Sequence, residues 1–136
     1  MLTETDASLL TIRLISDLDR ELTFAAEQAR QQFHVPASAE VRCVGYESHP
    51  APIIEAYLEI DICADFSLSF HMDVRRSSDH WIISRSIQKD AIHSENLRSF
   101  EDVHTSDMQD LARTVLACAG EGVRDLGQLA AHQQAA

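Results

Sequence analysis

The sequence predicts an α+β fold: an antiparallel sheet of four to five strands, flanked along the chain by an N-terminal and a C-terminal helix. Residues 53–88 contain three consecutive strand patterns, and a helical pattern lies on either side of the strand region. A sheet that is apolar on one face needs a cover, so both helices are expected to pack on one face. The length of 136 residues fits a single α+β domain spanning residues 1–136.

The most regular strand pattern covers residues 66–75, where apolar and polar residues alternate without interruption. Successive side chains of a strand point to opposite faces, so this strand has a dry face and a wet face. The dry face carries Phe66, Leu68, Phe70, Met72 and Val74, and the wet face carries Ser67, Ser69, His71, Asp73 and Arg75. We therefore expect a central strand at this position.

The first helix is predicted from Ser16 to about His34, because apolar residues recur there at spacings of three and four. Residues 1–15 fit either an earlier start of this helix, from Thr5 or Asp6, or a short strand. The helix should end near His34, since the following Val35–Pro36 pair disfavours helical backbone.

The other strands are predicted at residues 40–47, 53–63 and 81–88. Turns are expected between the strands at 48–52, which contains two prolines, at 64–65, and at the polar cluster 76–79.

The region after the strands is less regular. Residues 89–96 are polar and predict a loop, and residues 97–104 fit one last short strand, although Phe100 and Val103 conflict in phase. A second helix should begin at Ser106, which forms a capping box with Gln109. It either ends at the glycines of 120–122 or continues through Leu129, and the last residues, 133–136, are expected to fray.

The chain is acidic, with 22 Asp and Glu against 11 Lys and Arg, a formal net charge of −11. Such a chain repels nucleic acid and anionic membranes and attracts basic proteins. The first residues do not resemble a signal peptide, and no segment has the length of a membrane span. The three cysteines match no metal or redox spacing, which favours reduced, partly buried thiols in the cytoplasm.

No motif indicates catalysis. The seven histidines lack metal-ligand spacing, and the four glycines form no phosphate-binding loop. Glu59, Asp61, His71 and Asp73 share the wet face, but acid–base chemistry would also require a pocket that moves their pKa values apart. We therefore expect no catalytic residue, no metal and no cofactor.

The wet face of the sheet is the predicted binding surface. Acidic residues combined with a tyrosine suit recognition of a basic protein surface, because charge speeds the encounter and the aromatic ring anchors the contact. A solvated face without a partner is an equally good interpretation. The predicted partner-binding residues are Glu55, Tyr57, Glu59, Asp61, His71, Asp73 and Arg75.

In size, acidity and helix–sheet–helix order, the chain resembles small bacterial immunity proteins, which bind and block a toxin domain, often a basic nuclease. The resemblance implies a cytoplasmic, non-enzymatic inhibitor that masks the active site of its partner. No residue motif supports this resemblance, so we assign no residue a role from the family.

Two other functions fit the sequence. Secretion chaperones are also acidic α+β proteins of similar length and are usually dimers, but they normally have a helix between strands. A small enzyme or ligand carrier would use a pocket between the sheet and the helices. The chain is expected to be a monomer or a homodimer.

Overall fold

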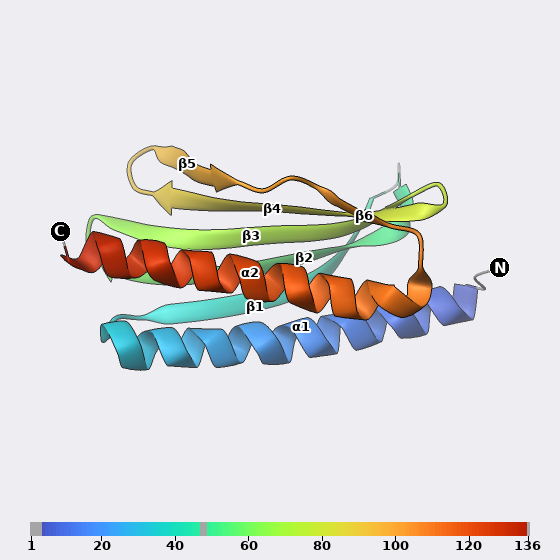
Figure 1. Cartoon of the computed structure of the whole chain (residues 1–136), viewed down its shortest axis with the longest axis horizontal. Helices are drawn as coiled ribbons and strands as arrows, with labels where there is room; N and C mark the ends of the chain where they lie inside the picture. Colours follow the sequence, from blue (N-terminus) through green and yellow to red (C-terminus); the bar gives the residue numbers. More distant parts are fainter. Residues whose placement is uncertain (1–3, 47–48, 136) are drawn as a thin grey trace.

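The computed structural model describes residues 4–46 and 49–135, and it confirms the α+β fold (Figure 1). The strands form one antiparallel sheet in the order β1-β2-β3-β4-β5, and β6 also pairs with β4. This is one strand more than predicted, because β5 and β6 lie one after the other along the same side of β4. In chain order the elements are α1 (Glu4–Phe33), β1 (Ala37–Tyr46), β2 (His49–Cys63), β3 (Phe66–Ser77), β4 (His80–Asp90), β5 (Ser94–Ser99), β6 (Val103–Thr105) and α2 (Met108–Ala135).

Both helices pack on the apolar face of the sheet. In Figure 1, α2 crosses in front of the middle strands and α1 runs beside β1, and α1 and α2 also contact each other. The predicted dry face of β3 is therefore the face that the helices cover. The buried core includes Leu14, Leu18 and Leu22 of α1, Leu58 and Ile60 of β2, Leu68 and Phe70 of β3, Ile83 and Ile87 of β4, and Leu111, Val115 and Leu126 of α2.

Helix α1 resolves the ambiguity of the first residues, because residues 4–15 are helical rather than a strand. The helix ends as predicted. His34 adopts a left-handed backbone with φ of 57°, and its N–H donates to the carbonyl of Arg30 over 3.0 Å. This is a common way to end a helix, and Pro36 then prevents its continuation.

The N-cap of helix α2 lies one residue later than predicted, and at the glycines the helix follows the second of the two predicted courses. Asp107, not Ser106, is the N-cap: its Oδ1 accepts a hydrogen bond of 2.9 Å from the N–H of Gln109. The helix passes the glycines of 120–122 and ends at Ala135. The expected fraying is wrong for residues 133–135, because Gln134 Nε2 donates to the carbonyl of Phe33 over 2.7 Å.

The β1–β2 hairpin is longer than predicted. β1 begins at Ala37, and Glu47, the predicted end of this strand, lies outside the described residues together with Ser48. The predicted turn at 48–52 is wrong for residues 49–52, which belong to β2. The register between β2 and β3 begins at Ile54, so both prolines precede it, where a missing N–H is tolerated.

The loop predicted at residues 89–96 is shorter than expected. Residues 91–93 form the connection, because β4 extends to Asp90 and β5 already begins at Ser94. These strand ends are polar, so backbone pairing holds them in the sheet without an apolar pattern to reveal them. The break between β5 and β6 explains the phase conflict, because Phe100 lies in that break and Val103 begins a new strand.

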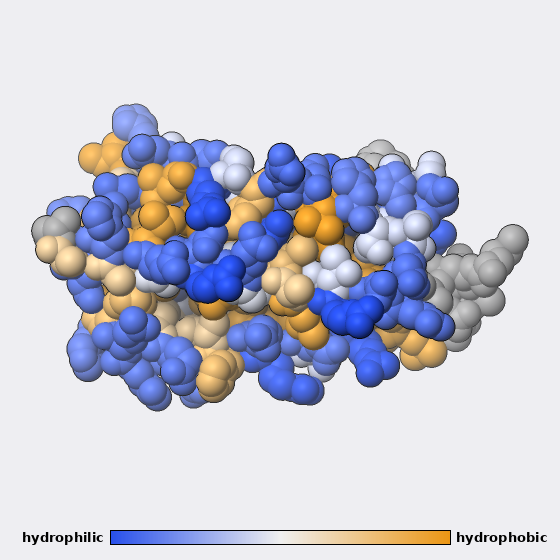
Figure 2. Space-filling model, viewed as in Figure 1, coloured by the Kyte–Doolittle hydropathy of each residue, from blue (hydrophilic) through white to orange (hydrophobic). Residues whose placement is uncertain are grey.

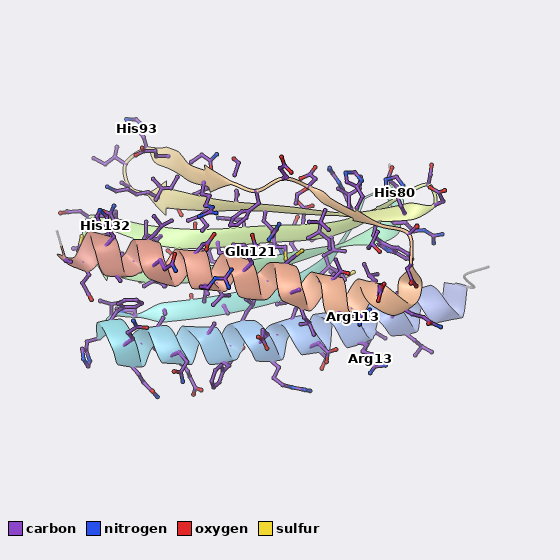
Figure 3. The ribbon with its side chains drawn as sticks, in the orientation of Figure 1. Arg13, His80, His93, Arg113, Glu121 and His132 are labelled. Atoms are coloured by element: carbon purple, nitrogen blue, oxygen red, sulfur yellow. The ribbon has the colours of Figure 1, made fainter. Side chains whose placement is uncertain are left out.

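An arginine is buried on the helix-covered face. Arg85 of β4 donates to the carbonyl of Cys118 over 3.2 Å, lies 3.6 Å from the carboxylate of Glu121, and stacks at 4.5 Å on the ring of Phe100. Glu121 lies midway along α2 (Figure 3). Of the three free cysteines, Cys118 is buried as expected, whereas Cys43 and Cys63 are exposed.

Candidate functional site on the open sheet face

The face of the sheet opposite the helices is hollowed rather than flat. Its hollow has a volume of about 710 Å³ and spans four neighbouring strands, β1 to β4. The lining combines carboxylates, an arginine, two aromatic rings and hydroxyls, so it offers both charged groups and apolar surface to a guest. The lining residues are Glu40, Arg42, Glu55, Ala56, Tyr57, His71, Met72, Asp73, Ser84, Arg85 and Ser86.

Four of the seven predicted binding residues line this hollow: Glu55, Tyr57, His71 and Asp73. Glu59 lies beside it and contacts Tyr57. The other two are exposed at opposite ends of the sheet, since Asp61 pairs with Ser67 and Arg75 pairs with Ile82.

The sequence-based prediction omitted several residues of this face. Glu40 and Arg42 enter the hollow because β1 pairs with β2 in a register that places them opposite Tyr57 and Glu55. The sequence predicted a strand over residues 40–47, but not its register against the strand that carries Tyr57 and Glu55. Ser84 and Ser86 of β4 were placed on the wet face without being counted among the binding residues, and Asp90 was expected in a loop.

Tyr57 forms the aromatic centre of the hollow. Its hydroxyl donates to Glu59 Oε2 over 2.5 Å, and its ring meets the ring of His71 edge-on, with centroids 4.9 Å apart. Burial, followed by the hydrogen bond to Glu59, raises the pKa of the Tyr57 phenol well above its usual value. The phenol therefore remains a neutral hydrogen-bond donor.

His71 belongs to a chain of hydrogen bonds with Ser69 and Asp90. Ser69 Oγ donates to Asp90 Oδ2 over 2.7 Å and lies 2.9 Å from His71 Nε2. A hydroxyl has one proton, so His71 must donate through Nε2–H, which fixes the tautomer. In a catalytic triad the histidine takes the serine proton, whereas here that proton points to Asp90.

Ser69 is, in addition, fully buried. It was predicted on the exposed wet face together with Ser67, which is buried as well. Ser69 Oγ contacts the side chains of both His71 and Asp90, which flank it on this face. Ser69 is therefore an internal link in the site and not an accessible nucleophile.

Asp73 is a partly unsatisfied carboxylate in the hollow. Its Oδ1 is buried and has no hydrogen-bond partner, and it lies opposite Glu55 on one neighbouring strand and Ser84 on the other. Burial raises the pKa of the Asp73 carboxyl, the nearby Asp102 and Glu55 raise it further, and Arg75 opposes them. A cation placed in the hollow would relieve both the burial cost and the repulsion.

An ion pair between Arg42 and Glu55 crosses the hollow. Arg42 holds Glu55 Oε2 through its NH2 at 2.8 Å and its Nε at 2.9 Å. Among the lining residues, Glu40, Glu55 and Asp73 are acidic and Arg42 and Arg85 are basic. Arg85 points to the helix side, where it contacts Cys118 and Glu121, so the balance within the hollow is negative.

A second depression lies between the two helices. It has a volume of about 510 Å³, its floor includes Leu58 and Ile60, and its walls come from α1 and α2. Figure 2 shows apolar residues among hydrophilic ones over these helices. Phe24 is exposed at its rim. This groove is the space between sheet and helices that a ligand carrier would use.

None of the protein-family models, curated proteins or solved structures compared with the chain matches it. Neither α1 nor α2 has an apolar stretch long enough to cross a membrane. Within residues 4–46 and 49–135, no group of three or more His, Cys, Asp or Glu side chains is arranged to hold a metal ion. His80 and His93 lie at opposite ends of the sheet (Figure 3).

The protonation of His71 should make folding sensitive to mild acid. Burial lowers the pKa of His71 below its usual 6.5, although Asp90, Glu59 and Glu55 oppose this shift. As the pH falls below 6.5, the unfolded chain binds a proton that the folded chain resists, so the free energy of unfolding should fall.

We expect His71→Gln to reduce this loss of stability, measured by urea unfolding at pH 7.5 and 5.5, because glutamine does not titrate. The matched control is His132→Gln, since His132 is exposed on α2. Equal pH dependence of wild type and His71→Gln would show that the imidazole does not titrate as inferred.

Proposed function

We propose that this chain is a non-enzymatic, immunity-type inhibitor that neutralises a basic toxin domain in the cytoplasm through its open, acidic sheet face. The observation that carries the proposal is the hollow in that face, with the buried and unpartnered Oδ1 of Asp73 within it. The helices cover the opposite face, so a partner can approach this one.

The chemistry of the hollow favours an arginine or lysine side chain of the partner as its occupant. A guanidinium group would find a carboxylate at Asp73 and aromatic rings at Tyr57 and His71, which together provide hydrogen-bond acceptors and stacking surfaces. A nuclease active site is rich in basic residues because it binds phosphates. An inhibitor that takes one of those residues into the hollow would block substrate entry.

The acidic residues around the hollow would guide the encounter. Glu59 and Asp61 follow Glu55 along the same face of β2, and a line of like charge raises the association rate with an oppositely charged protein. Their contribution should be strongest at low ionic strength, where charges are screened least.

Charge reversal tests this surface. We expect Glu55→Lys, Glu59→Lys and Asp61→Lys together to slow association with the partner by about tenfold or more at low salt, with a smaller effect at high salt. Stopped-flow or surface-plasmon-resonance kinetics at several salt concentrations would measure this.

The matched control reverses three exposed acids of α1: Asp19→Lys, Glu21→Lys and Glu27→Lys. Both triple variants change the net charge equally, so a difference between them reports the location of the partner. The proposal fails if the two triple variants slow association equally, or if neither does.

The partner itself can be found by affinity capture from the cells that express the chain naturally, followed by mass spectrometry. The wild type and the α1 variant should both retain a basic protein that the sheet variant loses. Purified with the inhibitor, that protein should lose its toxic activity. Capture of a secreted, non-toxic effector would instead indicate the secretion-chaperone alternative, although no helix separates the strands in the described chain.

A ligand carrier could use either the groove between the helices or the hollow of the open face, and the hollow is favoured because it contains both His71 and Asp73. A carrier of this kind would bind a free cationic metabolite such as an amino acid or a polyamine. Isothermal titration with arginine and with spermidine, comparing wild type with Asp73→Asn, separates this function from protein binding.

A further inference from the structure

Within residues 4–46 and 49–135, no other strand pairs with the outer edge of β1. β1 is the end strand, and its register with β2 runs without a shift from Ala37 to Val44. The opposite edge is divided between β5 and β6, and its register shifts at Ile87–Gln88. Proteins commonly interrupt their edges in this way to prevent pairing, and β1 lacks such protection in this run.

The hydrogen-bond pattern identifies the backbone groups on this edge. Asp61 N donates to the carbonyl of Pro36 over 2.9 Å, and the groups that bond to a neighbouring antiparallel strand alternate along the chain. Residues 38, 40 and 42 therefore bond to β2, whereas Ala39, Val41 and Cys43 direct their N–H and C=O groups outward. One end of the edge is closed, because Arg30 NH1 donates to the carbonyl of Ala37 over 2.7 Å.

The side chains of β1 are self-complementary about Val41. We propose that β1 pairs antiparallel with β1 of a second copy of this chain, centred on Val41, to form a two-fold symmetric dimer with one continuous sheet. In this register, Glu40 of each copy lies opposite Arg42 of the second copy, so two opposite-charge pairs form across the interface. Directly opposed charges of opposite sign stabilise such a pair, and like charges destabilise it.

The alternative registers are less favourable. In each allowed register, the residues that face each other must direct their side chains to the same face of the sheet. Moving the centre of the pair by one residue changes each residue's partner by two positions, so it meets this condition. Centring the pair on Glu40 would place two glutamates opposite each other, and centring it on Arg42 would oppose two arginines. The register on Val41 avoids both, and it places Ala39 opposite Cys43, which are small enough to fit.

The dimer does not rest on the proposed inhibition, but its charge pairs use Glu40 and Arg42, which also line the hollow. The arrangement leaves both hollowed faces on the same side of the joined sheet, and both α1 helices on the other side. Arg42 retains its contact with Glu55 in this arrangement, since a guanidinium has five N–H donors and can serve two carboxylates.

Light scattering after size-exclusion chromatography tests the dimer. We expect the wild type to approach twice the 15.2 kDa mass of one chain as its concentration rises. Glu40→Arg and Arg42→Glu should each remain monomeric, because each places like charges opposite each other. An equimolar mixture of the two variants should form a heterodimer, and the double variant Glu40→Arg/Arg42→Glu should dimerise again.

Recovery in the mixture separates the interface from a folding defect, since a misfolded variant would not be rescued by another. Circular dichroism of each variant provides the check on folding. The proposal is overturned if the wild type remains at 15.2 kDa at all concentrations, or if a dimer forms whose mass is insensitive to both charge variants. Neither outcome would affect the proposed inhibition, which is measured by toxin binding.

Discussion

Replacing Gly122 by alanine is expected to lower the free energy of unfolding by about 1–3 kcal/mol, because the new methyl group would overlap the ring of Phe70. Gly122 lies in the middle of α2, where it is buried against β3. Phe70 is fully buried at the centre of the core, so its ring has no space into which it can move. Urea unfolding monitored by circular dichroism would measure the loss.

The two other glycines of α2 provide matched controls. A Cβ at Gly120 or at Gly127 would meet nothing within 4 Å. We expect alanine at either position to raise the free energy of unfolding by about 0.5–1 kcal/mol, because alanine restricts the unfolded chain and favours the helix. Similar stabilisation by all three substitutions would show that the ring of Phe70 is not packed against Gly122.

A double variant locates the cause of the effect. Phe70→Leu removes the part of the ring that Gly122 contacts, so Gly122→Ala should cost less in that background than in the wild type. Contacting residues show this kind of non-additivity, whereas distant residues do not.

The glycines of α2 also show which part of the fold the sequence could predict. The alternation of residues 66–75 placed Phe70 on the covered face because burial alone decides that pattern. Helix propensity left open whether the helix ends at Gly120 and Gly122 or continues, and packing overrides propensity where a close approach requires a residue without a side chain. The sequence does not show which strand a helix packs against. The contact with Phe70 that requires a glycine at position 122 is therefore seen only in the structure.

The binding site was predictable to a similar extent. Period-two alternation placed Tyr57, His71 and Asp73 on a shared face, and the antiparallel pairing of β2 with β3 brought them together. Glu40 and Arg42 were missed because the register of β1 against β2 depends on tertiary structure. The hollow is formed by residues of four strands, so it depends on strand registers that no residue pattern in this chain revealed.

Asp73→Asn is expected to separate stability from binding. The substitution keeps the shape of the side chain and removes a charge that has no hydrogen-bond partner at Oδ1 and faces Glu55 across the strands. We expect the free energy of unfolding at pH 7 to rise by up to about 1 kcal/mol. Affinity for the basic partner should fall about 30-fold or more, because a buried cation would lose its carboxylate.

The pH dependence of the free energy of unfolding tests this prediction without the partner. Because the pKa of Asp73 is raised in the folded chain, its charged form costs stability above that pKa, and the cost disappears as the pH falls below 3.8. The advantage of Asp73→Asn over the wild type should therefore be present at pH 7 and shrink in acid. Urea unfolding at both pH values would measure it.

The matched control is Asp65→Asn, the same chemical change at an exposed position in the β2–β3 turn. It should leave both stability and affinity close to those of the wild type. A residue that only supports the fold would lose stability when altered, whereas a residue kept for binding should gain stability and lose affinity. If Asp73→Asn is less stable than the wild type, or binds the partner equally well, Asp73 is not the carboxylate that receives the cation.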